Sequence, residues 1–280
     1  MRVMSSSTLL KGDLLLPTDA SELRLVQVTD THLTGTPDGE LLGMNTARSA
    51  RAVIDAAKSS GNIDGFLVTG DIAADEQPTA YVQLAEMLGQ DIPSLWLPGN
   101  HDDIRSHLEP LEPHLRRRLR TPNWDVVMLE TQVQGEVGGA LKASELAALA
   151  AAIDQAIAEN KYLLVATHHP LRTMGSAWLD EQSVRNADEA LHLLAPHADR
   201  VMTISGHVHQ ESDAVISGIR MLTTPSTCVQ FAPGSEDFAL DDLSPGYRSL
   251  RLYADGSVQT EVVRVSDENN RPLIGSSGYH

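Results

Sequence analysis

The stretch Gly99–Asp102 constrains the fold of this chain more than any other part of its sequence. It follows the apolar run Ser94–Pro98, which is typical of a buried strand that ends in a turn. An amide, an imidazole and a carboxylate then come in succession, at Asn100, His101 and Asp102. Such side chains suit a metal site better than a core. The stretch could also cap a following helix, so it does not decide the matter alone.

Four more polar motifs have the same placement, each after a predicted buried strand. Asp30-Thr31-His32 follows 23–28, Gly70-Asp71 follows 66–68, His168-His169-Pro170 follows 162–166, and Gly206-His207-Val208-His209 follows 201–204. Taken singly, most of them could be helix caps or turns. With His101 they hold six of the 11 histidines, and the carboxyl ends of parallel strands meet at one edge of a sheet. We therefore expect all five motifs to converge on one metal centre.

Strands and helices alternate through the first hundred residues. Helical spacing over 45–58 and 78–88 separates the first three strands, which predicts a layered α/β fold with its site at the carboxyl ends of the strands. Segment 34–43 is expected to be a loop, 13–16 an edge strand and 126–129 a further strand, and helices are expected over 104–119, 141–160 and 188–194. The last third predicts antiparallel strands over 214–216, 220–223, 249–253 and 258–265, with a hairpin turn at Asp255-Gly256.

Length and composition favour a single domain over 1–280, with an ordered core over 13–266 and a tail over 267–280 that is mobile unless docked. The net charge of −17 argues against non-specific nucleic-acid binding. The Arg116–Arg118 run is expected to be a solvated basic face. Cys228 is the only cysteine, and no stretch approaches the length of a membrane span. We expect a cytoplasmic protein that binds neither nucleic acid nor membrane.

The candidate ligands favour transition metals. They offer three oxygen and four nitrogen ligands and no sulfur: Asp30, His32, Asp71, Asn100, His168, His207 and His209. Such a set suits Mn, Fe or Zn better than Ca or Mg. Seven ligands exceed the needs of one ion, but they can serve two divalent ions if Asp71 bridges them. Two ions, two aspartates and a bridging hydroxide leave a charge of about +1, which would attract a phosphodiester anion.

This chemistry predicts a hydrolytic mechanism. A metal-bound water that loses its proton near neutral pH would be the nucleophile, and the two ions would clamp the phosphate. His101 is the candidate donor of a proton to the leaving oxygen, and Asp102 is expected to orient its imidazole. His169 is expected to support the site rather than to bind metal.

In this order, the five motifs resemble those of the calcineurin-like metallophosphoesterases, over residues 30–209. The resemblance implies an α/β four-layer sandwich, with two central mixed β-sheets flanked by helices. It also implies that Asp30, His32, Asp71 and His209 hold one metal ion, and that Asp71, Asn100, His168 and His207 hold the other. The position at which some members have a tyrosine ligand is Ala74 here, so a purple acid phosphatase is not expected.

Further stretches are similar to the bacterial class III 3',5'-cyclic-AMP phosphodiesterases, among them 42–46, 176–180, 184–187, 224–231 and 244–248. This similarity implies hydrolysis of 3',5'-cyclic AMP to 5'-AMP, which lowers cyclic-AMP signalling. It also implies substrate contacts at these residues: His32, Asp71, Asn100, His101 and His209. We hypothesise that 42–46 and 224–231 line the nucleotide pocket.

Several alternatives stay open at this point. A broader phosphodiesterase could act on 2',3'-cyclic nucleotides or glycerophosphodiesters. A non-catalytic scaffold could share the fold, although all seven ligands and His101 are present. A nuclease would need a basic groove, which the sequence does not indicate. Fe and Mn are the favoured ions and Zn an alternative, and a homodimer is one candidate oligomeric state.

Overall fold

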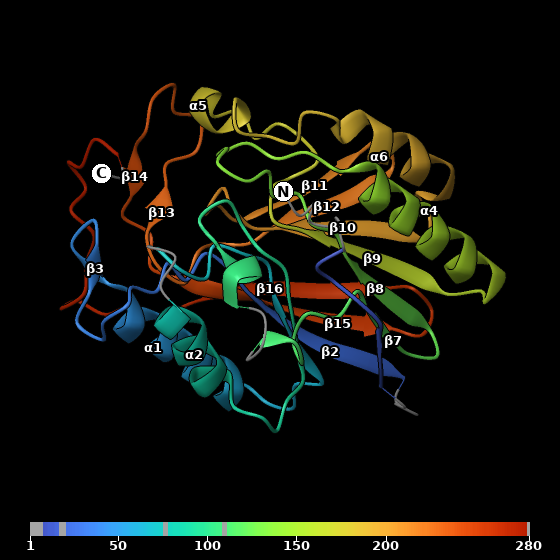
Figure 1. The fold of residues 1–280 in the computed structure, drawn as a ribbon, viewed down its shortest axis with the longest axis horizontal. Coiled ribbons are helices and arrows are strands. Elements are labelled where there is room, and N and C mark those ends of the chain that lie inside the picture. The colour runs from blue at the N-terminus through green and yellow to red at the C-terminus, as the bar shows by residue number, and fades with distance from the viewer. Residues whose placement is uncertain (1–7, 17–20, 75–77, 108–110, 279–280) are drawn as a thin grey trace, which may run out of the picture.

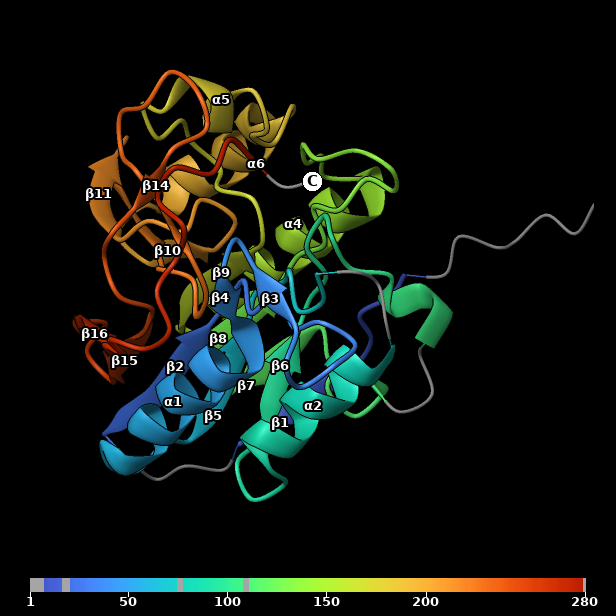
Figure 2. The ribbon, with the colours of Figure 1, turned by 90° about the vertical axis from the view of Figure 1, so that its left-hand side faces the viewer.

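The computed structural model describes residues 8–16, 21–74, 78–107 and 111–278. Its two main sheets lie face to face between two helical layers, with α1 and α2 on one side and α4 and α6 on the other (Figure 1 and Figure 2). The predicted α/β four-layer fold is therefore confirmed. The helices are α1 (Thr46–Ser59), α2 (Pro78–Leu88), α4 (Ala143–Ala158), α5 (Ala177–Asp180) and α6 (Ala187–Leu194), with 3-10 turns η1 (Ile104–His107) and η2 (Ala195–His197).

The five-stranded sheet has the order β16-β15-β2-β5-β6. Its strands are β2 (Glu22–Val28), β5 (Gly65–Val68), β6 (Ser94–Trp96), β15 (Gly246–Tyr253) and β16 (Val258–Arg264). Strands β2, β5 and β6 run parallel, with Val28 beside Val68 and Val68 beside Trp96. Their carboxyl ends are therefore level, which brings the motifs after them to one edge. The predicted hairpin at Asp255-Gly256 joins β15 to β16.

The seven-stranded sheet has the order β1-β7-β8-β9-β10-β12-β11. Its strands are β1 (Asp13–Leu15), β7 (Arg118–Arg120), β8 (Trp124–Met128), β9 (Tyr162–Thr167), β10 (Val201–Ser205), β11 (Ser212–Ile216) and β12 (Ile219–Thr223). In the parallel pair β9 and β10, Thr167 lies beside Ser205. The histidines that follow these strands are thereby brought to the same edge. Short strands β3 (Glu40–Leu41) and β4 (Met44–Asn45) form one small sheet, and β13 (Gln230–Phe231) and β14 (Leu240–Asp241) another.

Residues of alternating orientation fill the cores on both faces of the seven-stranded sheet. Val126 and Leu164 belong to the core shared with the other sheet, whereas Val127 and Leu163 pack with the α4 and α6 side chains. This alternation follows from the two-residue period of a strand. Because both faces are covered, these strands are apolar runs rather than alternating ones.

The helix predicted over 104–119 is wrong. Among the described residues of this segment, η1 and Leu111 are helical, whereas 112–117 form turns and irregular structure and Arg118 already belongs to β7; residues 108–110 lie outside the described residues. Pro113 has no backbone N–H to donate, which disfavours a continuous helix. The solvated basic face is wrong as well, because Arg117 is mostly buried and forms an ion pair with Glu145. The expected loop over 34–43 also contains β3.

The segment after Val265 docks on the start of α1. The Asn270 side chain accepts the Asn45 N–H at 2.7 Å and donates to the Asn45 carbonyl at 2.9 Å. Leu273 N–H donates to the Leu42 carbonyl at 2.8 Å. The tail was expected to be mobile unless it docks, and residues 267–278 are docked. Among the described helices, none is long and apolar enough to cross a membrane.

Candidate metal centre

All seven predicted ligands meet where the two sheets present their carboxyl ends. Six of them are buried, and only Asn100 is partly exposed. Two sets of ligand atoms can be distinguished, and both include the carboxylate of Asp71.

The first set draws mainly on the loops after β2 and β10. His32 Nε2 lies 3.2 Å from His209 Nε2, and His209 Nε2 lies 3.5 Å from Asp30 Oδ1. Asp71 Oδ2 lies 3.9 Å from His32 Nε2. These atoms converge on a space that one ion could fill.

The second set draws on both sheets. Asn100 Oδ1 lies 3.1 Å from His168 Nε2 and 3.1 Å from His207 Nδ1. Asp71 Oδ2 completes the set at 3.3 Å from His168 Nε2. The same Asp71 oxygen therefore faces both sets, as the predicted bridge requires.

Hydrogen bonds on the far side of two rings turn their Nε2 atoms toward the centre. His168 Nδ1 donates to the Thr69 carbonyl at 2.7 Å, and His209 Nδ1 donates to the Val229 carbonyl at 2.8 Å. A histidine that binds metal is neutral, so with the ring proton on Nδ1 each Nε2 would present a lone pair toward the centre. Two nitrogens about 2.1 Å from one ion lie roughly 3.0–3.4 Å apart. The donors thus fit a pair of divalent ions by chemistry and by spacing.

The charges of the site also favour the binding of divalent ions. Burial and neighbouring histidines hold the pKa of His207 well below its ordinary value, and burial does so for His32 despite the Asp71 charge. Both rings are therefore neutral and able to bind metal. Burial alone would lower the pKa of His168, but the Asp71 and Asp30 carboxylates outweigh it and raise this pKa to about 9. The two carboxylates attract positive charge to this point.

Five of the ligands have an uncommon backbone conformation. Asp30, His32, Asp71, His207 and His209 all have positive φ values, between 43° and 67°. The described residues include only three other non-glycine residues of this kind. Such conformations are costly for residues with a Cβ and concentrate at functional sites. They turn each side chain from its strand toward the common centre.

Two motif glycines make room for ligands of other motifs. A Cβ on Gly99 would lie 2.1 Å from Asp71 Oδ1, and a Cβ on Gly206 would lie 2.6 Å from Asp30 Oδ2. Any larger residue would therefore displace one of the two carboxylates. This close approach gives a physical reason for glycine before Asn100 and before His207.

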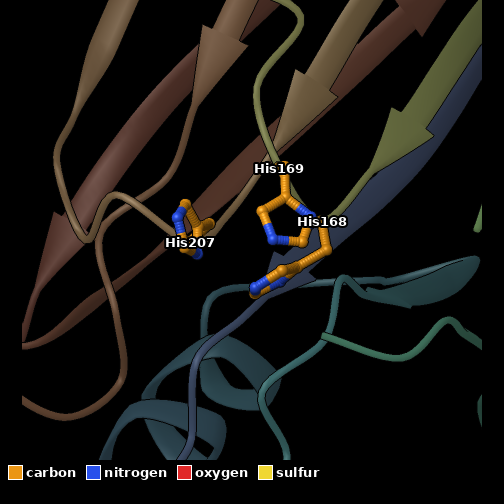
Figure 3. Close-up of side chains that lie close together, drawn as sticks. All are labelled: His168, His169 and His207. Atoms are coloured by element: carbon orange, nitrogen blue, oxygen red, sulfur yellow. The ribbon is translucent and has the colours of Figure 1, made fainter. Parts of the chain in front are cut away.

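His169 packs against the ligand rings without an available nitrogen (Figure 3). Its Nδ1 lies 2.8 Å from the Thr131 hydroxyl, and its Nε2 donates to the Val137 carbonyl at 2.9 Å. Burial lowers the pKa of His169 to about 3, so the ring is neutral. These contacts support the predicted role of His169 as a supporting residue.

Asp102 connects two loops of the site through backbone contacts. Its carboxylate accepts the backbone N–H groups of Ile72 and Ala73 at 3.0 Å and of Gly99 at 2.9 Å. Both oxygens thus tie the loop after β5 to the loop after β6, and the expected orientation of His101 by Asp102 stays a prediction. The His101 side chain is partly exposed beside the His32 ring, at 5.1 Å between centroids, and the His101 backbone N–H donates to Asp71 Oδ1.

Sequence reasoning missed the groups that hold the ligands from behind. The carbonyls of Thr69 and Val229 orient two histidines, and backbone carbonyls have no sequence signal. The Ser226 hydroxyl donates to the Asp30 carbonyl at 2.6 Å. Phe231 stacks on the His209 ring at 4.1 Å between centroids.

The two stretches expected to line a nucleotide pocket come together beside His209. Met44, Val229 and Phe231 belong to one apolar cluster. Segment 224–231 is buried throughout, yet Gln230 and Phe231 line a pocket beside His209, whereas Leu42 and Gly43 are partly exposed. A lining role beside His209 is therefore supported for Gln230 and Phe231, and for 42–46 it stays a prediction.

Comparisons with known proteins agree with this geometry. Residues 23–211 match the family model of the calcineurin-like phosphoesterases. The chain is 41% identical over 266 residues to the 3',5'-cyclic adenosine monophosphate phosphodiesterase CpdA of Pseudomonas aeruginosa, covering 94% of this chain and 97% of that protein. It is 38% identical over 265 residues to the protein of the same name from Escherichia coli K12, covering 92% and 96%.

Solved structures show the same fold at low sequence identity. A dimetal phosphatase from Danio rerio superposes with a TM-score of 0.58 at 16% identity, covering 87% of this chain and 99% of that one. A purple acid phosphatase from yellow lupin gives 0.61 at 17% identity, covering 89% and 52%.

Proposed function

Because this chain belongs to the calcineurin-like phosphoesterase family, we propose that it hydrolyses 3',5'-cyclic AMP to 5'-AMP at the centre described above. The observation that carries the proposal is the convergence of seven ligand side chains into two sets that share Asp71 Oδ2. Relatives that share 38–41% identity over more than nine tenths of this chain are named for this substrate, which supports the choice of cyclic AMP.

Two divalent ions, Fe or Mn before Zn, would be held by Asp30, His32, Asp71 and His209 on one side and by Asp71, Asn100, His168 and His207 on the other. When bound, such ions supply Lewis acidity toward the phosphate and lower the pKa of water. The residues of the chain do the rest. Water adds to phosphorus, the bond to O3' breaks, and that oxygen takes up a proton. His101 is the partly exposed side chain placed to deliver this proton.

We assign substrate contacts to His32, Asp71, Asn100, His101 and His209, all of which lie around the same centre. Asn100 is the partly exposed member of the ligand set, so its amide can reach a bound phosphate. A buried neighbour such as Asp30 holds the centre without access to solvent.

Initial rates on three cyclic nucleotides test the proposal. The purified protein, loaded with Mn²⁺ or Fe²⁺, is assayed on 3',5'-cyclic AMP, 3',5'-cyclic GMP and 2',3'-cyclic AMP. Asn100→Ala should abolish turnover, and Asn62→Ala, at an exposed position, should not. Selective turnover of 3',5'-cyclic AMP supports the proposal. Comparable rates on all three would favour a broader phosphodiesterase, and no turnover with any metal would favour a scaffold.

A further inference from the structure

Three consecutive residues after β8 each contact a different part of the site. Gln132 reaches the loop after β6 of the other sheet, Glu130 reaches Arg105 in η1, and Thr131 reaches His169 after β9. We call Glu130–Gln132 the bridge segment. Its backbone is fixed at the start, because Glu130 N–H donates to the buried Glu145 carboxylate at 2.9 Å.

Gln132 holds both ends of the loop that carries Asn100 and His101. Its Nε2 donates to the Gly99 carbonyl at 2.7 Å and to the Asp102 carbonyl at 2.5 Å. Since both neighbours are acceptors, only the amide nitrogen can occupy this position. One side chain therefore closes the loop from the opposite sheet.

The two other bridge residues act on either side of Gln132. The buried Glu130 carboxylate accepts Arg105 Nη2 at 2.6 and 2.7 Å, and Arg105 lies in η1, directly after the same loop. The Thr131 hydroxyl lies 2.8 Å from His169 Nδ1, next in sequence to the ligand His168. The bridge segment thus contacts the loop that carries Asn100 and the residue next to His168, which belong to the two halves of the second ligand set.

We propose that the bridge segment sets the distance between the two halves of the second ligand set, with Gln132 as the positioning residue for Asn100 and His101. This inference rests on the proposed function. The set takes Asp71 and Asn100 from one sheet and His168 and His207 from the other. Apolar packing between sheets is not directional, whereas hydrogen bonds fix a loop to a fraction of an ångström. Ligand and proton-donor geometry needs that precision.

The test compares Gln132→Met with Gln134→Met. The first removes both donors and keeps the length of the side chain, and the second makes the same change at an exposed position of the same loop. Mn²⁺ alone is titrated into each metal-free protein by calorimetry, and kcat and KM are then measured on 3',5'-cyclic AMP. Losing two hydrogen bonds should weaken one of the two Mn²⁺ sites about tenfold and lower kcat about tenfold, with KM within about twofold. Gln134→Met should match the wild type.

Gln132→Glu gives a second, independent variant. It keeps the shape of the side chain but places a carboxylate oxygen against two carbonyl oxygens, so its losses should equal or exceed those of Gln132→Met. Wild-type Mn²⁺ affinities and kcat in both variants would overturn the proposal. If the wild-type protein hydrolyses no cyclic nucleotide, the proposed function fails, but the Mn²⁺ titrations still decide whether the bridge positions the ligands.

Discussion

Gly99→Ala should disable the centre through a single added methyl group. The new Cβ would lie 2.1 Å from Asp71 Oδ1 and 2.4 Å from the Asp71 backbone nitrogen, where real contacts are not closer than 3.0 Å. The φ angle of Gly99 lies outside the left-handed region, so the effect is one of space rather than of backbone conformation. Because one of the clashing atoms belongs to the backbone, rotation of the Asp71 side chain cannot relieve the overlap.

The size of the effect follows from this overlap. Asp71 and the new methyl group must separate by about 0.9 Å, and misplacing a reacting group by about 1 Å can cost about 100-fold in rate. Since Asp71 Oδ2 faces both ligand sets, both ions should bind more weakly. Forcing a methyl group into a packed site costs about 1–3 kcal/mol, which lowers the melting temperature by several degrees.

The assay follows kcat on 3',5'-cyclic AMP, the two Mn²⁺ affinities and the melting temperature of the metal-free protein. Gly275→Ala is the matched control, because a Cβ there meets nothing within 4 Å and its φ is also outside the left-handed region. The variant should lose about 100-fold in kcat while the control loses none. A Gly99→Ala protein with two wild-type Mn²⁺ affinities and full kcat would refute the assignment of Asp71 as the shared ligand.

Three further predictions address other parts of the molecule. His101→Ala should lower kcat on 3',5'-cyclic AMP at least about 100-fold, yet much less on bis(p-nitrophenyl) phosphate, whose leaving group needs no proton; equal losses on both would exclude a general acid. Arg117→Met should lower the free energy of unfolding by about 3–5 kcal/mol in urea, because it leaves the buried Glu145 unpaired, and adding Glu145→Met should restore part of this. Burial lowers the pKa of His114 below 6.5, so the unfolded chain binds its proton more readily and stability falls as the pH drops below about 6.5. His114→Gln should flatten this fall between pH 7.5 and 5.5, and an unchanged slope would contradict it.

The sequence was most informative where local pattern and tertiary structure agree. Apolar runs followed by Asp, Asn or His predicted both the parallel strands and the edge at which seven ligands meet. The reason is that the carboxyl ends of parallel strands all lie at the same edge of a sheet. The segment 104–119 had no such constraint. Its apolar spacing suited a helix, but Arg118–Arg120 pairs with β1 and β8, and long-range pairing of this kind has no local signature.

The supporting residues were invisible for a related reason. The sequence indicated that Asp102 is important, since it stands beside Asn100 and His101, but not that both its oxygens accept backbone N–H groups. Gln132 stands in no motif, and its importance depends on two carbonyl groups that lie 33 and 30 residues away in the chain. Which side chain orients another is decided in three dimensions.

The ligands also hold one another, which explains how five unfavourable backbone conformations persist in one site. The His207 N–H donates to the Asp30 carboxylate at 3.0 Å, and the His101 N–H donates to Asp71 Oδ1 at 2.9 Å. The Asp30 and His32 N–H groups in turn donate to carbonyls of Gly70 and Asp71. A left-handed residue costs about 1–2 kcal/mol, and these hydrogen bonds, of which the two to carboxylates are charge-assisted, offset part of that cost before any ion binds. Each motif therefore serves twice, with its side chain toward the metal and its backbone toward the ligand of another motif, so the loss of one motif should loosen the others.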